Sequence, residues 1–373
     1  MSGLRNWTSW VAAILALAAL LLPAGQAGER PIHWVGRGWL LLPIGILLAI
    51  ALLGLARDRR QLGDGLLALL GAVTGAAAPI LLLADGPALG LAAPGFWLLV
   101  LAVGVMAWRA LEILAVARGP AWIGAVLVPG LFGLLLLYYW QVLVVGFAVS
   151  PILLPSPARI GQVLVSHLGQ EWQDFRQTFL KSVLAGFALG SGAGFITAVL
   201  VERSPFLQRG LLPLGGLVSA IPIVGIAPIM VMWFGFDWQS KAAVIVVMTF
   251  FPMLINTLAG LRSVSDIERD LMWSYAAGYG QTLRKLRLPN ALPFIFNALK
   301  INSTLSLIGA IVAEFFGTPV VGMGFRISVE IGRMNVDMVW ATIAVAALAG
   351  SMFYGVLALL ERGLTFWHPS YRQ

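Results

Sequence analysis

Apolar residues run along this chain in stretches of about 20, and short segments that hold most of the charges separate them. A helix of about 20 apolar residues crosses the ~30 Å hydrocarbon core of a bilayer. Lipid offers no partner for an unpaired backbone N–H or C=O, so each stretch is expected to be helical. The pattern predicts ten spans, near residues 7–24, 39–56, 65–84, 95–117, 121–149, 178–201, 211–235, 240–260, 298–317 and 338–361.

The composition supports an all-α polytopic membrane protein. Hydrophobic residues make up 60% of the chain and charged residues 11%, against ~25% charged in soluble domains. The absence of cysteine excludes disulfides and thiolate chemistry, and three scattered histidines (His33, His167 and His368) leave little for a metal site. The net charge of +8 does not predict nucleic-acid binding, because the basic residues punctuate apolar runs instead of forming one solvated face.

Lysine and arginine predict the orientation, because they are enriched in cytoplasmic loops. With both termini in the cytoplasm, the basic residues gather on that side: Arg5, Arg57, Arg59, Arg60, Arg118, Arg203, Arg209, Arg262, Arg269, Arg284, Lys285, Arg287, Lys300, Arg362 and Arg372. The first apolar run, with small residues at 25–27, also fits a cleavable signal peptide spanning residues 1–27. Its removal would leave the orientation of every later span unchanged.

The chain divides near residue 120. Residues 1–120 hold four spans with few polar residues. Arg109 and Glu112 lie one turn apart in the fourth span, as a structural pair or as part of a proton relay. Beyond residue 150, an apolar stripe with helical spacing predicts an amphipathic helix at the membrane interface, or a plain surface connector: Ile160, Val163, Leu164, Leu168 and Trp172.

The largest polar insertion, residues 261–297, lies on the predicted cytoplasmic side. It contains acidic residues, a basic cluster and small residues midway, and Pro289 and Pro293 then interrupt any continuing helix. A short helix that small residues expose and charges frame is typical of a docking element for a cytoplasmic partner. No Gly-Lys dipeptide occurs, so the chain has no P-loop, and no hydrolase motif is present. The chain is therefore not predicted to be an enzyme.

Several intramembrane residues are candidates for a translocation path. Pro222 and Pro228 make the seventh span irregular, as in broken helices that border a cavity, although a kinked packing helix is the alternative. Glu314 is an acid deep in a span and lines a path or joins two helices. The full path or gate set is Pro222, Pro228, Trp233, Phe251, Asn256 and Glu314. The glycines at 190–194 indicate close helix packing rather than phosphate binding.

The segment 261–293 resembles the conserved cytoplasmic loop of importer-type ABC permeases. That pattern reads Glu/Asp-Ala-Ala, three residues, Gly, nine residues, Ile-x-Leu-Pro. Leu288 and Pro289 match its end and place the acidic position at Asp270. Two positions depart from the pattern: Leu271-Met272 stand for the alanines, and Ala276 stands for the glycine. Gly278 and Gly280 are expected to supply the missing freedom of the turn.

Other segments resemble the nitrate/sulfonate/taurine/bicarbonate group of these permeases, whose related members serve pyrimidine precursors or riboflavin. They are Leu154-Pro155-Ser156-Pro157, Ile221-Pro222 through Ala227-Pro228, Trp233-Phe234-Gly235, Ser240-Lys241, Thr249-Phe250-Phe251-Pro252 and Ala313-Glu314-Phe315. The resemblance covers about residues 121–365 and implies a six-helix ABC type I permease core. Residues 1–120 are extra to that core, and residues 366–373 form a short tail.

The resemblance implies one permease subunit of an ATP-driven importer in the bacterial inner membrane, as a homodimer. An ABC ATPase dimer, which binds the ATP, would dock on the coupling loop, and a periplasmic binding protein would deliver the solute. No cofactor, metal or nucleic acid is expected for this chain. The implied coupling residues are Asp270, Leu271, Met272, Tyr275, Ala276, Ala277, Gly278, Tyr279, Gly280, Leu288 and Pro289.

A self-sufficient secondary transporter or channel is the alternative function, and a membrane enzyme is a third. A secondary transporter predicts inverted repeats or more buried ionisable groups, and the sequence displays neither. The expected solute is a sulfonate- or nitrate-like anion or a small aromatic or heterocyclic metabolite. The scarcity of Lys and Arg in the core spans favours the second class, with Trp233, Phe234 and Phe251 available for stacking.

Overall fold

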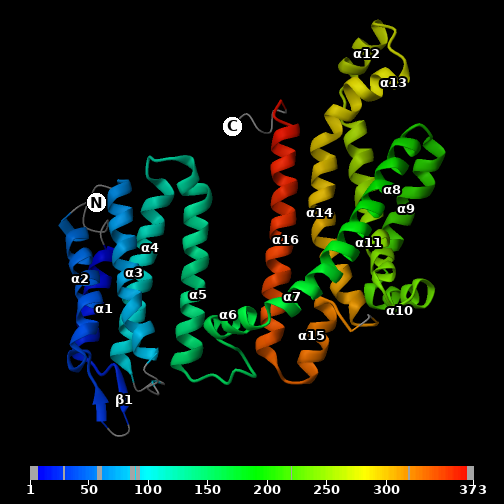
Figure 1. Ribbon diagram of the computed structural model, residues 1–373. Helices are drawn as coiled ribbons and strands as arrows, with labels where there is room; N and C mark the ends of the chain where they lie inside the picture. The colour runs from blue at the N-terminus through cyan, green and yellow to red at the C-terminus, as the bar shows by residue number, and fades with distance from the viewer. Residues whose placement is uncertain are drawn as a thin grey trace. The chain divides into compact units, whose positions relative to one another are not determined.

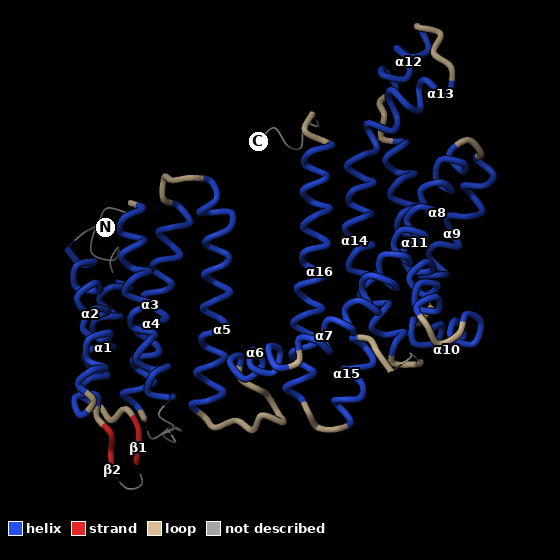
Figure 2. Tube along the Cα trace, viewed as in Figure 1, coloured by secondary structure: helices blue, strands red, loops and turns tan. Residues whose placement is uncertain are grey.

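The computed structural model describes residues 7–27, 30–56, 61–84, 89, 93–219, 221–317 and 320–367, and these are helical almost throughout (Figures 1 and 2). The predicted all-α polytopic fold is confirmed. Contacts divide the chain into two compact units, residues 1–159 and 160–373. The predicted cytoplasmic arginines Arg5, Arg57, Arg59, Arg60 and Arg372, and most of the 366–373 tail, lie outside the described residues.

The first unit is a helical bundle with one short hairpin, strands β1 (Gly25–Ala27) and β2 (Arg30–Ile32), which pair antiparallel. Two 3₁₀ turns follow, η1 (Trp34–Gly36) and η2 (Gly38–Leu40). The helices are α1 (Trp7–Leu21), α2 (Leu41–Ala56), α3 (Leu62–Ala84), α4 (Pro94–Val116) and, after the π-helical turn η4 (Ile123–Leu127), α5 (Val128–Gly146).

Small side chains hold α1 inside this bundle. An alanine stripe, Ala12, Ala16 and Ala19, is fully buried where α1 packs on α4 and α2. Such residues let helix backbones approach closely. Buried Arg109 on α4 donates to Thr8 Oγ1 at 3.3 Å and to the Gly54 carbonyl at 3.2 Å. It therefore links α4 to α1 and α2, as a structural residue does.

The second unit contains α7 (Leu168–Phe175), the π-helical segment η5 (Arg176–Val183), α8 (Leu184–Glu202), α9 (Pro205–Ser219), α10 (Ile223–Phe234), α11 (Trp238–Arg262), α12 (Asp266–Ser274), α13 (Tyr279–Thr282), the π-helical turn η6 (Leu283–Arg287), α14 (Leu288–Glu314), α15 (Met323–Gly332) and α16 (Val336–Leu364). Helix α6 (Pro157–Ser166) contains the boundary between the units.

Eight helices among the described residues are long and apolar enough to span a membrane. The other two of the ten predicted spans are represented by shorter apolar helices, α1 and α10. The predicted seventh span is split, because α9 ends at Ser219 and α10 begins after Pro222. The predicted interface helix is also split: α6 ends at Ser166, and α7 continues through η5 into α8 as one helix of 35 residues.

Helices α8, α11 and α14 pack closely at the centre of the second unit. The glycine-rich stretch of α8 lies on this contact. A Cβ at Gly190 would stand 2.0 Å from Thr249 Oγ1, and one at Gly194 would stand 2.4 Å from the Phe250 carbonyl oxygen. Only glycine permits this distance between α8 and α11, so the predicted packing role is confirmed for Gly190 and Gly194. It is wrong for Gly192, where an added Cβ would meet no atom of the described residues within 4 Å.

Candidate coupling loop and transport core

Local side-chain hydrogen bonds define the start of helix α12. Ser265 Oγ accepts from the Glu268 backbone N–H at 3.3 Å, and Glu268 Oε2 accepts from the Ser265 N–H at 3.0 Å, a reciprocal capping box. These bonds favour the ionised acid and hold the pKa of the Glu268 carboxyl below its ordinary value. Negative charge at this helix end also complements the helix dipole. The helix is therefore well defined although none of its residues is buried.

Helix α12 projects from the second unit together with α13 (Figure 1). The side chains of Ile267 and Trp273 are 82% and 83% exposed, and Tyr275 is 78% exposed. Large apolar side chains exposed together outside the spans mark a surface that a partner covers. Sequence reasoning included Tyr275 and missed the other two; their signal was an apolar side chain inside a charged loop.

The turn after α12 closes with backbone bonds from Ala276 N–H to the Trp273 carbonyl at 2.8 Å and from Ala277 N–H to the Met272 carbonyl at 3.0 Å. This Schellman pattern requires a left-handed residue at Ala276, whose φ is +51°. Neither Gly278 nor Gly280 has a positive φ, so the expectation that they supply the freedom of the turn is wrong. The hydrogen bonds fix which residue must turn, and that residue is the alanine.

Tyr279 anchors the loop to the end of α8. Its hydroxyl donates to Glu202 Oε2 at 2.9 Å, and the Arg203 guanidinium lies 4.2 Å from its ring centroid. Arg287, in η6, forms an ion pair with the same Glu202. Tyr279, expected to face a partner, is thus bound within the chain. We call Glu202, Arg203, Tyr279 and Arg287 the Glu202 junction; sequence reasoning did not identify it.

The remaining predicted loop residues take one of two positions. Asp270, Leu271, Gly278 and Gly280 are exposed, like Tyr275 and Ala276. Met272, Ala277, Leu288 and Pro289 are half-buried, and the last two begin α14. The expected interruption at Pro289 and Pro293 is wrong, because both prolines lie within one continuous helix, Tyr279–Glu314. The predicted loop therefore has an outward surface, on α12 and the turn after it, and an inward part that continues into the transmembrane core.

The six predicted path residues lie on three elements and do not form one cluster. Pro222 and Pro228 start and interrupt α10, where Trp233 is 71% exposed. Phe251 and Asn256 lie on α11, and Asn256 accepts from Asn297 Nδ2 on α14 at 3.4 Å. Six residues separate Asn256 from the end of α11 at the loop, whereas α10 and Glu314 lie near the opposite helix ends.

Glu314 ends α14 and is 2% exposed. Its two carboxylate oxygens accept from Thr178 Oγ1 at 2.8 and 3.0 Å, and Oε2 accepts from the Gly324 N–H at 2.8 Å. Thr178 Oγ1 in turn accepts from the Met323 N–H at 2.8 Å. A Cβ at Gly322 would lie 2.7 Å from the carboxylate. Glu314 therefore caps the first turn of α15 and joins it to η5.

Three further charged groups extend this arrangement, and we call all of them the Glu314 network: Glu314, Thr178, Asp174, Arg326 and Lys241. Asp174 accepts from the Gly322 N–H at 2.7 Å and from Arg326 Nε at 2.8 Å. Lys241 is 1% exposed, and its Nζ donates to the Phe236 carbonyl at 2.7 Å, to Ser240 Oγ at 3.3 Å and to the Gly317 carbonyl. Its three N–H donors all have partners.

Comparison with known proteins matches residues 190–366 to the family described as "Binding-protein-dependent transport system inner membrane component". The chain is 33% identical over 241 residues to a riboflavin transport system permease protein of Chloroflexus aurantiacus, covering 64% of this chain and 88% of that protein. It is 30% identical over 241 residues to a formylaminopyrimidine transport permease protein of Halalkalibacterium halodurans, covering 64% and 95%.

A putative aliphatic sulfonates transport permease protein of Bacillus subtilis is 29% identical over 254 residues, covering 67% of this chain and 89% of that protein. The matched region includes the α12–α13 loop, the Glu202 junction and Glu314. The predicted resemblance is confirmed, and the alternative of a self-sufficient transporter receives no support. The chain belongs to the family of binding-protein-dependent transport system inner membrane components and is a membrane-embedded ABC importer permease, which is not itself an enzyme.

Proposed function

We propose that two copies of this chain form the path of an importer in the bacterial inner membrane, with both termini and the α12–α13 loop in the cytoplasm. An ABC ATPase dimer binds and hydrolyses the ATP, and a periplasmic binding protein delivers the solute to the opposite side. The observation that carries this proposal is the group of exposed apolar side chains on α12 and at its C-cap, namely Ile267, Trp273 and Tyr275. A nine-residue helix with no buried side chain gains its packing only from a partner.

Movement of α12 would reach the spans through the Glu202 junction. Tyr279 follows the turn after α12, and Arg287 immediately precedes α14, so Glu202 joins the loop to α8 at two points. The side chains of Glu202 and Arg287 are only 11% and 19% exposed, so water weakens their attraction little. A partner that shifts α12 would therefore move α8 and α14 together, as a rigid-body transition requires.

We infer that the solute is a small neutral or heterocyclic metabolite rather than a strong anion. Each buried or nearly buried cation of the second unit's described residues already has a partner: Lys241 has backbone carbonyls, Arg326 has Asp174, and Lys300 has Glu361. An anion entering the core would find no uncompensated positive charge among these residues. The riboflavin and formylaminopyrimidine permeases among the relatives agree with this class.

The proposal is tested by affinity purification of the tagged chain from its native membrane, followed by mass spectrometry of the bound proteins. A P-loop ATPase should copurify in stoichiometric amount, and Gly278→Glu should abolish its binding, because a carboxylate would be placed in the exposed turn after α12. Gly210→Glu is the matched control. It is an exposed glycine on α9 with open space around it, outside the loop, and should leave copurification intact.

Two results would contradict the proposal. A chain that purifies alone after crosslinking would favour the alternative function, a self-sufficient transporter. Equal loss of the ATPase in both glycine variants would show that added charge, and not the α12 turn, causes the effect.

A further inference from the structure

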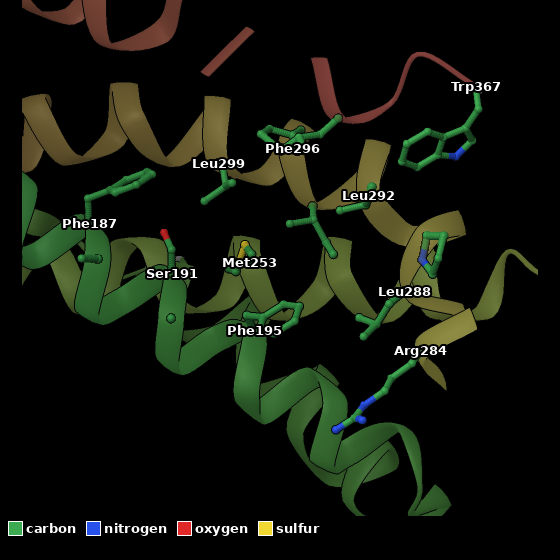
Figure 3. A pocket seen from close by; sticks show the side chains of 15 residues that line it. Phe187, Ser191, Phe195, Met253, Arg284, Leu288, Leu292, Phe296, Leu299 and Trp367 are labelled. Carbon is green, nitrogen blue, oxygen red and sulfur yellow. The ribbon is translucent and has the colours of Figure 1, made fainter. Parts of the chain in front are cut away.

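A large apolar cavity lies between α8 and α14 of the second unit, with Met253 of α11 behind it (Figure 3). Its volume is about 650 Å³, within the ~300–1,000 Å³ typical of small-molecule sites. Phe187 and Phe195 project from α8, and Leu292 and Phe296 project from α14. The transport function proposed above uses none of these residues.

The lining follows one face of each helix. On α14 it extends from Leu288 to Leu299, and at 1.5 Å per residue this is about 16 Å. Half of a ~30 Å hydrocarbon core is about 15 Å, so the cavity is as long as one bilayer leaflet is thick. Ser191 is the polar side chain on the α8 side, and its Oγ already accepts from Asn302 Nδ2 at 2.9 Å. A polar solute would therefore lose its hydration here without replacement.

One end of the cavity is positively charged. Arg284 and Trp367 lie at that end, while Phe187 and Leu299 lie at the other (Figure 3). Within the part of the chain that the structure describes, Arg284 and its exposed neighbour Lys285 form no ion pair. A cation and an indole at the end of an apolar groove match the interface between lipid headgroups and acyl chains.

We propose that this cavity binds an anionic phospholipid of the cytoplasmic leaflet, with one acyl chain between α8 and α14 and the phosphate on Arg284. The leaflet assignment rests on the proposed function, which places the α12–α13 loop in the cytoplasm. Charge selects an anionic headgroup, because no acid among the described residues pairs with Arg284. Since Arg284 belongs to η6, between the docking loop and α14, the lipid also stabilises the segment through which the proposed coupling movement passes.

The test counts lipids retained by the purified full-length chain. The protein is exchanged into dodecyl maltoside, washed, and titrated with phosphatidylglycerol or phosphatidylcholine, and native mass spectrometry reports the bound lipid. The wild-type chain should bind phosphatidylglycerol more tightly than phosphatidylcholine. Arg284→Gln should weaken phosphatidylglycerol binding about tenfold, the effect of losing one charge-assisted contact. Lys285→Gln, the neighbouring control outside the cavity lining, should change it little.

A second pair of variants tests the acyl-chain position. Gly192 lines the cavity, and a Cβ added there would meet no atom within 4 Å. Gly192→Leu should therefore fill the space without disturbing the helices and should reduce binding of both lipids. Gly355→Leu, on α16 and outside the lining, has equally open space and should leave both unchanged. Melting temperatures equal to that of the wild-type chain would show that these variants are folded.

Wild-type lipid retention in both Arg284→Gln and Gly192→Leu would overturn the proposal. Loss of the dimer in Gly192→Leu, with lipid retention unchanged, would instead show that a second copy of the chain packs into the cavity. The measurement requires neither an ATPase nor transport, so its failure is distinct from failure of the proposed function.

Discussion

Replacement of Glu314 distinguishes a structural carboxylate from one that lines a path. The carboxylate accepts from Thr178 and from the first turn of α15, and each hydrogen bond to a charged group is worth about 1.5–3 kcal/mol. Glu314→Ala removes both bonds and leaves buried donors unsatisfied, so we expect the free energy of unfolding to fall by about 3–5 kcal/mol. Glu314→Gln retains one acceptor oxygen in the same position and should lose roughly half as much.

The assay is thermal unfolding of the purified chain in detergent, together with uptake by the reconstituted importer. At about 2–4 °C per kcal/mol for a unit of this size, Glu314→Ala should lower the melting temperature by roughly 6–20 °C. Asp266→Ala is the control for the melting temperature, because this exposed acid pairs, among the described residues, only with Arg269 three residues away, and its replacement should change the melting temperature little. An unchanged melting temperature with lost uptake would refute the structural argument and place Glu314 on the solute path.

Three further outcomes follow from the loop and the core. Glu202→Gln should preserve ATPase binding but lower the amount of solute imported per ATP hydrolysed, and Tyr279→Phe should have a smaller effect. Proteoliposomes that report both rates measure this ratio, and an unchanged ratio in both variants would show that the Glu202 junction does not take part in coupling. Ala276→Gly should stabilise the turn after α12 by about 1 kcal/mol, seen as slower amide hydrogen exchange there, and faster exchange would contradict the left-handed strain. Gly190→Leu should keep α8 from packing on α11, so that no folded chain elutes on gel filtration, whereas Gly192→Leu should elute as a folded chain. Equal elution of the two variants would show that the close contact between α8 and α11 is not required for folding.

The spans and the docking loop could be predicted because their signals are local. Apolar length marks a membrane helix, and the Leu288-Pro289 end of the loop fixes the frame that leads back to Asp270. The breaks between helices at Pro222 and after Ser166 could not be predicted in the same way, because a proline or a polar residue inside an apolar run is compatible with either a kink or a break.

The polar networks could not be predicted, because their partners are distant in sequence. Thr178 and Glu314 are 136 residues apart, and Gly322 and Asp174 are 148 apart. Their meeting depends on how η5, α14 and α15 pack. Lys241 shows the same limit: its buried position depends on carbonyls at the ends of α10 and α14, which composition does not reveal. The left-handed Ala276 also contradicts residue preference, because backbone hydrogen bonds outweigh it.

Helix α14 joins the two ends of the transport core in one piece. Its 27 residues span about 40 Å, from the turn beside the Glu202 junction to Glu314. A helix of this length that tilts as one piece about its middle moves its two ends in opposite directions, by about 0.35 Å for each degree of tilt. Tilting of this one helix would thus widen the opening on one side of the membrane while it narrows the opening on the other side. The two sides would then not open at the same time.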